Sequence, residues 1–79
     1  RLPRDLSGRD LARALETFDY TVTRQSGSHL RLTTQLHGEH HITIPAHALL
    51  RVGTLAAILG EVARHLGIER SEVADRLFG

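Results

Sequence analysis

Histidine and arginine are the side chains of this sequence best suited to chemistry on a phosphate. The chain of 79 residues carries six histidines, and its ten basic residues are all arginines. An imidazole with an ordinary pKa of about 6.5 can accept or donate a proton near neutral pH. A guanidinium group offers a planar fork of donors that matches phosphate oxygens. A GC-rich gene would also favour arginine over lysine, so this composition alone indicates no function.

Cleavage of RNA is one reaction that such residues can catalyse. RNA carries its own nucleophile, the 2′-hydroxyl, so an enzyme needs a base, an acid and a cation for the phosphate charge. The base removes the hydroxyl proton, and the acid protonates the leaving 5′-oxygen. A histidine on a surface strand is more often inert than catalytic. On spacing alone, the alternative to RNA cleavage is therefore that these histidines have no catalytic role.

Metal binding is the other chemistry that many histidines suggest. His40 and His41 are adjacent on a predicted strand, so they point to opposite faces and cannot share one ion. His37 and His47 fall in predicted turns, and no carboxylate stands at a spacing that completes a zinc site. The chain also has no cysteine. We therefore expect no metal and no other cofactor, and we expect His65, near a helix C-terminus, to be structural.

The hydrophobic pattern predicts the elements that position these side chains. A helix is expected from the capping residue Ser7 to about residue 19, because apolar residues recur there at helical spacing. Alternating polar and apolar residues predict strands at 20–25, 29–34 and 41–44, with turns at 26–27 and 37–38. A second helix is expected from residues 53–54 to Gly67, followed by a short helix that contains residues 73–78. This order predicts an α+β fold in which the helices cover one face of a three-stranded antiparallel sheet.

Strand alternation assigns the side chains of the sheet to two faces. The covered face is expected to hold Val22, Leu30, Leu32, Ile42 and Ile44. The open face is then expected to hold Thr21, Thr23, Gln25, His29, Arg31, Thr33, His41 and Thr43. For Val22 to share a face with the leucines, the first hairpin needs a bulge or an odd-length loop, which we expect at Gly27.

The same arrangement predicts where two histidines could meet. His29 is expected at the end of its strand near Gln25, and the chain after the third strand runs back past that end at His47. Arg24 or Arg31 would lie nearby. These side chains form a possible site for phosphate chemistry at one edge of the sheet.

Composition limits the other classes of function. The formal net charge is +1, so charge alone does not indicate a nucleic-acid binder, and one tyrosine and two phenylalanines are too few for a base-stacking platform. No apolar run approaches the ~18 residues of a membrane span. We expect one domain over residues 1–79, a cytoplasmic location and no membrane partner.

Several motifs in order along the chain resemble the HicA/YcfA-like family, the small mRNA interferase toxins of bacterial type II toxin–antitoxin pairs. They are LSGRDL at 6–11, YTVTRQ at 20–25, GSH at 27–29, IPAH at 44–47, and GTL at 53–55 with IL at 58–59. Ser26 stands where the hairpin of this family usually carries a lysine.

The resemblance implies a double-stranded-RNA-binding-like α-β-β-β-α fold, here with an extra short C-terminal helix. It implies a metal-independent endoribonuclease that cleaves mRNA, inhibits growth and is neutralised by a HicB-like antitoxin. The catalytic histidine of the family falls on His29, and His47 matches a second recurrent histidine with a catalytic or supporting role. We expect Arg24, Arg31 and the backbone around Gly27 and Ser28 to bind the RNA phosphate. A non-catalytic RNA-binding module and a degenerate interaction subunit of a toxin–antitoxin complex are the alternatives.

Overall fold

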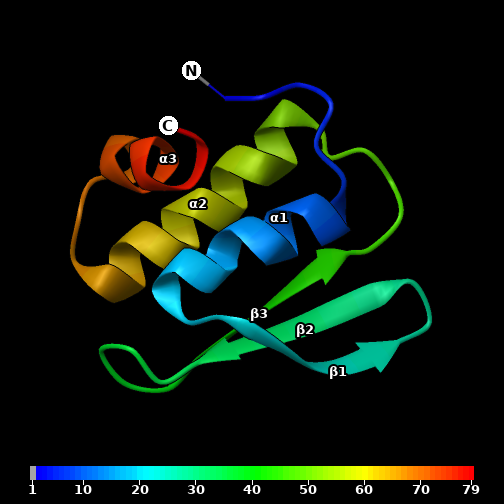
Figure 1. Cartoon of the computed structure of the whole chain (residues 1–79), viewed down its shortest axis with the longest axis horizontal. Coiled ribbons are helices and arrows are strands. Elements are labelled where there is room, and N and C mark those ends of the chain that lie inside the picture. The colour runs from blue at the N-terminus through cyan, green and yellow to red at the C-terminus, as the bar shows by residue number, and fades with distance from the viewer. Residues whose placement is uncertain (1) are drawn as a thin grey trace.

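The computed structural model describes residues 2–79 and has the predicted α+β architecture. Its elements are α1 (Gly8–Ala14), a 3₁₀ turn η1 (Leu15–Phe18), β1 (Thr21–Ser26), β2 (His29–Thr34), β3 (His40–Pro45), α2 (Val52–Leu66) and α3 (Arg70–Phe78). Figure 1 shows the three helices stacked on one side of the sheet, whose other side is open. No helix within residues 2–79 is long and apolar enough to cross a membrane.

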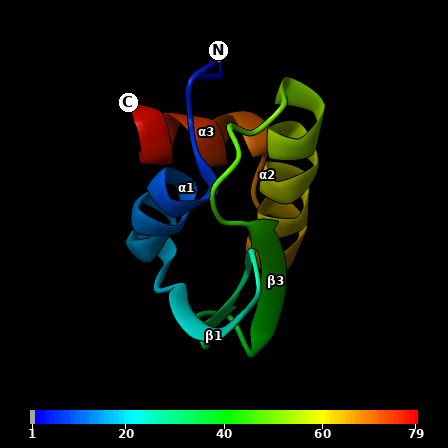
Figure 2. The same cartoon turned by 90° about the vertical axis from the view of Figure 1, so that its right-hand side faces the viewer.

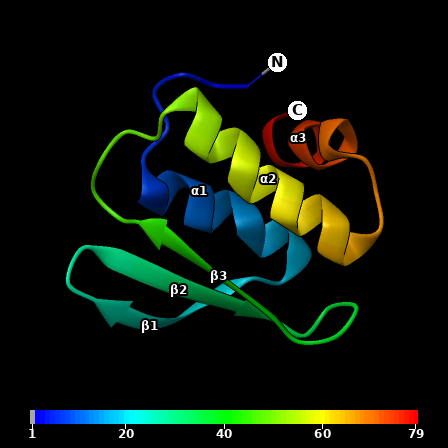
Figure 3. The same ribbon diagram turned by 180° about the vertical axis from the view of Figure 1, so that it is seen from behind.

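The three strands form an antiparallel meander in the order β1-β2-β3. Helices α1 and α2 lie side by side over it, and α3 packs behind them (Figures 2 and 3). The core between these layers takes its apolar side chains from every helix and from β2 and β3, and its fully buried members include Leu11, Leu15, Tyr20, Leu30, Leu32, Ile44, Leu55, Leu59, Val62 and Val73. The predicted covered face is therefore confirmed for the second and third strands.

The start of α1 is fixed against the end of β3. Ser7 and Asp10 form the predicted capping box, in which each side chain accepts a hydrogen bond from the backbone N–H of the other. Gly8, which follows Ser7, lies so close to the sheet that a Cβ atom there would be 1.6 Å from the carbonyl oxygen of Pro45. The backbone N–H of Arg9 donates to the carbonyl of Ala46 at 3.2 Å. Only glycine permits this approach, which sets α1 beside the hairpin end of the sheet.

The first strand departs from the predicted arrangement in three respects. Val22 lies on the helix side opposite Leu32, but it remains 47% exposed at the edge of the sheet, beside a groove that α1 leaves open. The bulge is at Thr23, between the paired positions of Val22 and Arg24, and not at Gly27. Beyond the bulge the alternation is reversed, so Gln25 faces the helices opposite Leu30 and not the open face.

The predicted end of α2 is confirmed. Gly67 adopts the left-handed conformation with a φ of 70° and stops the helix, as glycine does without steric cost. The apolar side of α2 then covers the sheet through residues such as Leu55, Leu59 and Val62. With both helices on one face, the polar side chains of the other sheet face remain accessible.

Candidate functional site

A cavity of about 200 Å³ on the open face of the sheet gathers three of the six predicted site residues, His29, Arg24 and Arg31. Its lining residues are Arg24, Ser26, His29, Arg31 and Thr43. The strand register explains this grouping, because residues directly opposite each other in an antiparallel pair point to the same face. Ser26 is opposite His29, Arg24 is opposite Arg31, and Arg31 is in turn opposite Thr43.

The turn between β1 and β2 brings His29 to the end of the cavity. Gly27 has a φ of 59° and forms a two-residue turn with Ser28. A positive φ at the first turn position is the signature of a type II′ hairpin and favours glycine. Both residues are exposed, and they lie beside the cavity without lining it. The carbonyl of Ser28 accepts a 2.7 Å hydrogen bond from the N–H of Ala46, which fixes the turn to the chain after β3.

Two arginines face each other across this cavity. Arg24 and Arg31 are direct cross-strand partners, and within residues 2–79 neither forms a salt bridge. Like charges in this position destabilise a sheet. An anion placed between two guanidinium groups would relieve the repulsion and accept several hydrogen bonds. The pair is therefore suited to bind a phosphate.

The structure does not place His47 in this cavity. His29 is paired with Pro45 at the end of β3, and His47 follows two residues later in an exposed bend. His47 is not among the residues that line the cavity. Within residues 2–79 the ring nitrogens of His29 form no hydrogen bond, so they are available to a ligand.

A second polar group on the open face escaped the sequence analysis. The ring of His41 binds the Thr33 hydroxyl through Nδ1 and the Glu39 carboxylate through Nε2, both at 2.7 Å. The Thr33 hydroxyl also lies 2.8 Å from that of Thr23. The hydrogen bond with His41 is the largest cause of the lowered pKa of the Glu39 carboxyl group. The positive charge of Arg31 adds to this lowering. Because both nitrogens of His41 are engaged, this ring is held in place, whereas His29 is free.

The pattern that could have indicated this group is the spacing of Glu39 and His41. Residues two apart in a strand share a face, and Thr33 was already predicted beside His41. Strand alternation does not assign the Glu39 carboxylate to a face, because Glu39 precedes β3 by one residue. The other expectations for this part of the open face, which concern His41, Thr33 and Thr43, are confirmed.

The remaining histidines of the sheet and α2 lie on the helix side. The Tyr20 hydroxyl is 2.7 Å from Nδ1 of His40, and the His40 ring stacks on that of His65 with centroids 4.4 Å apart. Nε2 of His65 donates to the carbonyls of Leu36 and Gly38, at 2.8 and 3.0 Å. This confirms the predicted structural role of His65, which ties α2 to the turn between β2 and β3. His40 and His41 do point to opposite faces.

Burial changes the ionisation of this cluster. It raises the pKa of the Tyr20 hydroxyl to about 12, with a further contribution from the negative charge of Glu61. Burial also lowers the pKa of His40, and the neighbouring His65 ring adds to that effect. Both shifts favour the neutral forms, as expected for rings packed under a helix.

A family model described as the HicA toxin of bacterial toxin–antitoxin systems matches residues 8–68. This range includes α1, all three strands and α2. No curated protein and no solved structure matches the chain.

Proposed function

The chain belongs to the HicA toxin family of bacterial toxin–antitoxin systems, and from that membership we propose that it is an endoribonuclease that cleaves mRNA. The observation that carries this proposal is the cavity on the open face, where His29 lies beside two arginines. A free imidazole next to two guanidinium groups provides the base and the cations that transesterification of RNA requires.

The proposed reaction begins with the phosphate between Arg24 and Arg31. His29 removes the proton of the adjacent 2′-hydroxyl, and the resulting oxygen attacks phosphorus. The P–O5′ bond breaks, and the 5′-oxygen leaves with a proton from a general acid, for which His47 is the candidate. The products are a 2′,3′-cyclic phosphate and a 5′-hydroxyl, and the two guanidinium groups stabilise the charge that develops on the phosphate oxygens. The backbone N–H groups of the turn at Gly27 and Ser28 lie beside the cavity as further donors.

His47 is the proposed supporting residue. It lies in the exposed bend directly after β3, at the same end of the sheet as His29. A bound RNA strand that extends beyond the cavity would pass this bend, so His47 is a candidate for the acid or for a contact to the leaving side.

The proposed partner is a HicB-like antitoxin that neutralises the toxin. Family membership supports it, because the toxin of such a pair is made together with its inhibitor. Masking the cavity would suffice for inhibition, since His29 and both arginines are exposed on the same face.

A variant of His29 tests the catalytic assignment. Expression of the wild-type chain should arrest growth, and the purified chain should cleave mRNA without added metal to products that end in a 2′,3′-cyclic phosphate. His29→Ala should abolish both effects while the circular dichroism spectrum stays unchanged. His37→Asn, in an exposed turn outside the cavity, is the control and should cleave normally, because asparagine tolerates the positive φ of that position. Undiminished cleavage by His29→Ala would refute the assignment.

A non-catalytic RNA-binding module is the second candidate. The observation that favours it is that His29 is the one histidine lining the cavity in residues 2–79. This alternative predicts RNA binding by the wild-type chain with no product formed, and with equal affinity for His29→Ala. Co-expression with a HicB-like antitoxin separates it from a toxin, because only cells that express an active toxin would gain viability from the antitoxin.

A further inference from the structure

Strand β1 is an exposed edge of the sheet. In the part of the chain that the structure describes, β1 pairs with β2 alone, and all six of its residues are exposed. One of them is Val22, on the side of the sheet that the helices otherwise cover. An unpaired strand of this length, without proline or lysine, is a template for a further strand.

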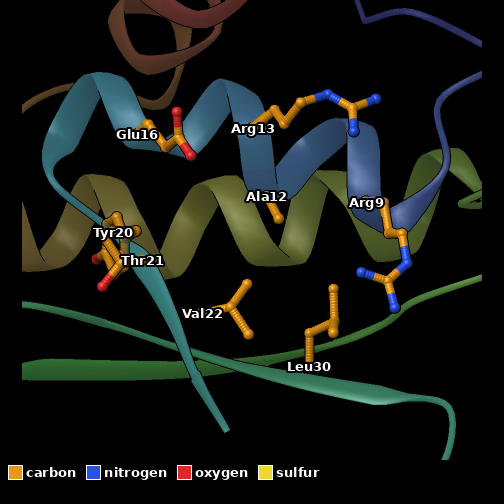
Figure 4. Close-up of a pocket in the computed structure, with 8 residues that line it drawn as sticks. All are labelled: Arg9, Ala12, Arg13, Glu16, Tyr20, Thr21, Val22 and Leu30. Atoms are coloured by element: carbon orange, nitrogen blue, oxygen red, sulfur yellow. The ribbon is translucent and has the colours of Figure 1, made fainter. Parts of the chain in front are cut away.

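A groove runs along this edge between β1 and α1. It has a volume of about 120 Å³ and is lined by Arg9, Ala12, Arg13, Glu16, Tyr20, Thr21, Val22 and Leu30. Figure 4 shows Ala12, Val22 and Leu30 facing one another across it, with Arg9 at one end and Glu16 toward the other. Arg13 is already paired with Asp10. The groove therefore has an apolar middle, a positive end and a negative end.

The ends of the groove are tied to the two ends of β1. The Arg9 guanidinium donates to Gln25 near the end of the strand, at 3.3 Å. Glu16 lies on η1, close to the chain segment that leads through Tyr20 into Thr21. If a second β1 were added antiparallel about a two-fold axis, the positive end of each groove would meet the negative end of the other. Such a surface is complementary to itself.

The bulge at Thr23 permits one register of this pairing in which both residues of every cross-strand pair lie on the same face of the sheet. Because of the bulge, Val22 and Gln25 both lie on the helix side, whereas Thr21, Thr23, Arg24 and Ser26 lie on the open side. Pairing Val22 with Gln25 of a second copy also pairs Thr21 with Ser26 and Thr23 with Arg24. Every pair then shares a face, and Arg24 is not directly opposite its own copy. In a regular strand, residues three apart would lie on opposite faces and this register would be impossible.

We propose that two copies of this chain associate through antiparallel pairing of their β1 strands, with Arg9 of each copy against Glu16 of the other. Val22 is then covered by the second copy, and the two sheets become one sheet of six strands. This inference goes beyond the proposed function. It also predicts that the two open faces are continuous, so that Arg24 of the second copy lies next to the cavity of the first.

Charge exchange tests the pairing. Sedimentation of the wild-type chain should show a dimer whose fraction rises between about 1 μM and 1 mM. Arg9→Glu and Glu16→Arg each place like charges at both ends of the interface, so either variant alone should weaken dimerisation by about tenfold or more. An equimolar mixture of the two variants should regain the dimer, because the mixed pair has opposite charges at both ends. Both residues are exposed, so neither substitution disturbs the core.

The control is Arg64→Glu, which makes the same charge change at an exposed position of α2 and should leave dimerisation unchanged. A wild-type chain that stays monomeric up to about 1 mM would overturn the proposal. So would a dimer that neither variant weakens, or two weakened variants whose mixture stays monomeric. Protection of the β1 amides on addition of the antitoxin to a monomeric chain would assign this edge to that partner instead.

Discussion

His29 is accessible because of the two residues that precede it. Gly27 and Ser28 close the hairpin in two residues, so His29 becomes the first residue of β2 and is paired directly with Ser26. The alternation of β2 then places Arg31 on the same face, and the cross-strand partner of Arg31 is Arg24. His29, Arg31 and Arg24, all within the described residues 2–79, thus line one cavity, and no hydrogen bond or ion pair joins any two of these side chains.

Ser26 is the residue of the cavity at which a substitution should strengthen RNA binding. It faces His29 and lines the cavity, and it carries no charge. Ser26→Lys adds a cation there, so the affinity for single-stranded RNA should rise by up to about fivefold, with a salt dependence steeper by about 0.7 in log–log slope. Fluorescence anisotropy with labelled RNA measures both quantities. Ser71→Lys, an exposed position at the start of α3, should change neither; a similar gain from both variants would argue against binding at the cavity.

Helix α2 and the turn between β2 and β3 are joined through histidine rings. His65 projects from α2, donates to two carbonyls of the turn and stacks on His40 at the start of β3. Tyr20, on the segment leading into β1, completes the cluster through the contact of its hydroxyl with Nδ1 of His40. Helix α2, the turn between β2 and β3, and the segment before β1 meet at this cluster. The charge of one ring therefore affects the free energy with which α2 packs on the end of the sheet that is remote from His29.

The cluster should make stability depend on pH. The hydroxyl of Tyr20 contacts His40, and besides burial the charges that act on the His40 pKa are those of His65, Glu61 and, from the opposite face of the sheet, His41. The pKa of His40 is lowered in the folded chain from 6.5, so between the two values the unfolded chain binds more protons. This contribution to stability is therefore present above about pH 6.5 and is lost as the pH falls through the lowered pKa.

The melting temperature of the wild-type chain should accordingly fall between pH 7 and pH 5. In His40→Gln, which removes the titrating ring, the fall should be smaller. Calorimetry at several pH values measures it, with His37→Asn as the control, because the exposed His37 has a φ of 58° that asparagine tolerates. An equal fall in His40→Gln and in the wild type would contradict this role of His40.

The whole molecule carries little net charge, so the RNA binding proposed above would depend on local groups. The formal net charge is +1, with ten basic and nine acidic residues. The open face concentrates two arginines at the cavity and confines its carboxylate, Glu39, to a hydrogen bond with His41. Under the proposed function, an RNA strand would meet a small positive site on a nearly neutral protein, and long-range attraction would contribute little.

This charge distribution predicts a weak salt dependence of RNA binding. With two arginines as the main phosphate contacts, the slope of log K against log salt concentration should be about −1.4 for single-stranded RNA. His29→Ala is the suitable protein for this titration, since its substrate stays intact. A slope of about −4 or steeper would show that many other arginines contact the RNA and would contradict a compact site.

The sequence by itself determined the order of the elements, the faces of β2 and β3, and the residues of the site that lie on β2. These features follow from local spacing, because alternation along a strand and the helical repeat are properties of consecutive residues. His29 and Arg31 could be placed on one face for this reason. The capping box at Ser7 and the stop at Gly67 are local in the same sense, and both were predictable.

Only the tertiary structure decided the arrangement of β1 and of the histidines beyond β2. The bulge at Thr23 depends on how β1 is hydrogen-bonded to β2, and the exposure of Val22 depends on where α1 docks through Gly8. The stacking of His40 on His65 joins residues 25 positions apart, and the bend after β3 separates His47 from the cavity. Such contacts arise from strand register and helix docking, which no periodicity in one segment specifies. His29 and Arg31 were thus predictable as exposed residues of one face, whereas the fold decided that Ser26 and Arg24 of β1 lie opposite them.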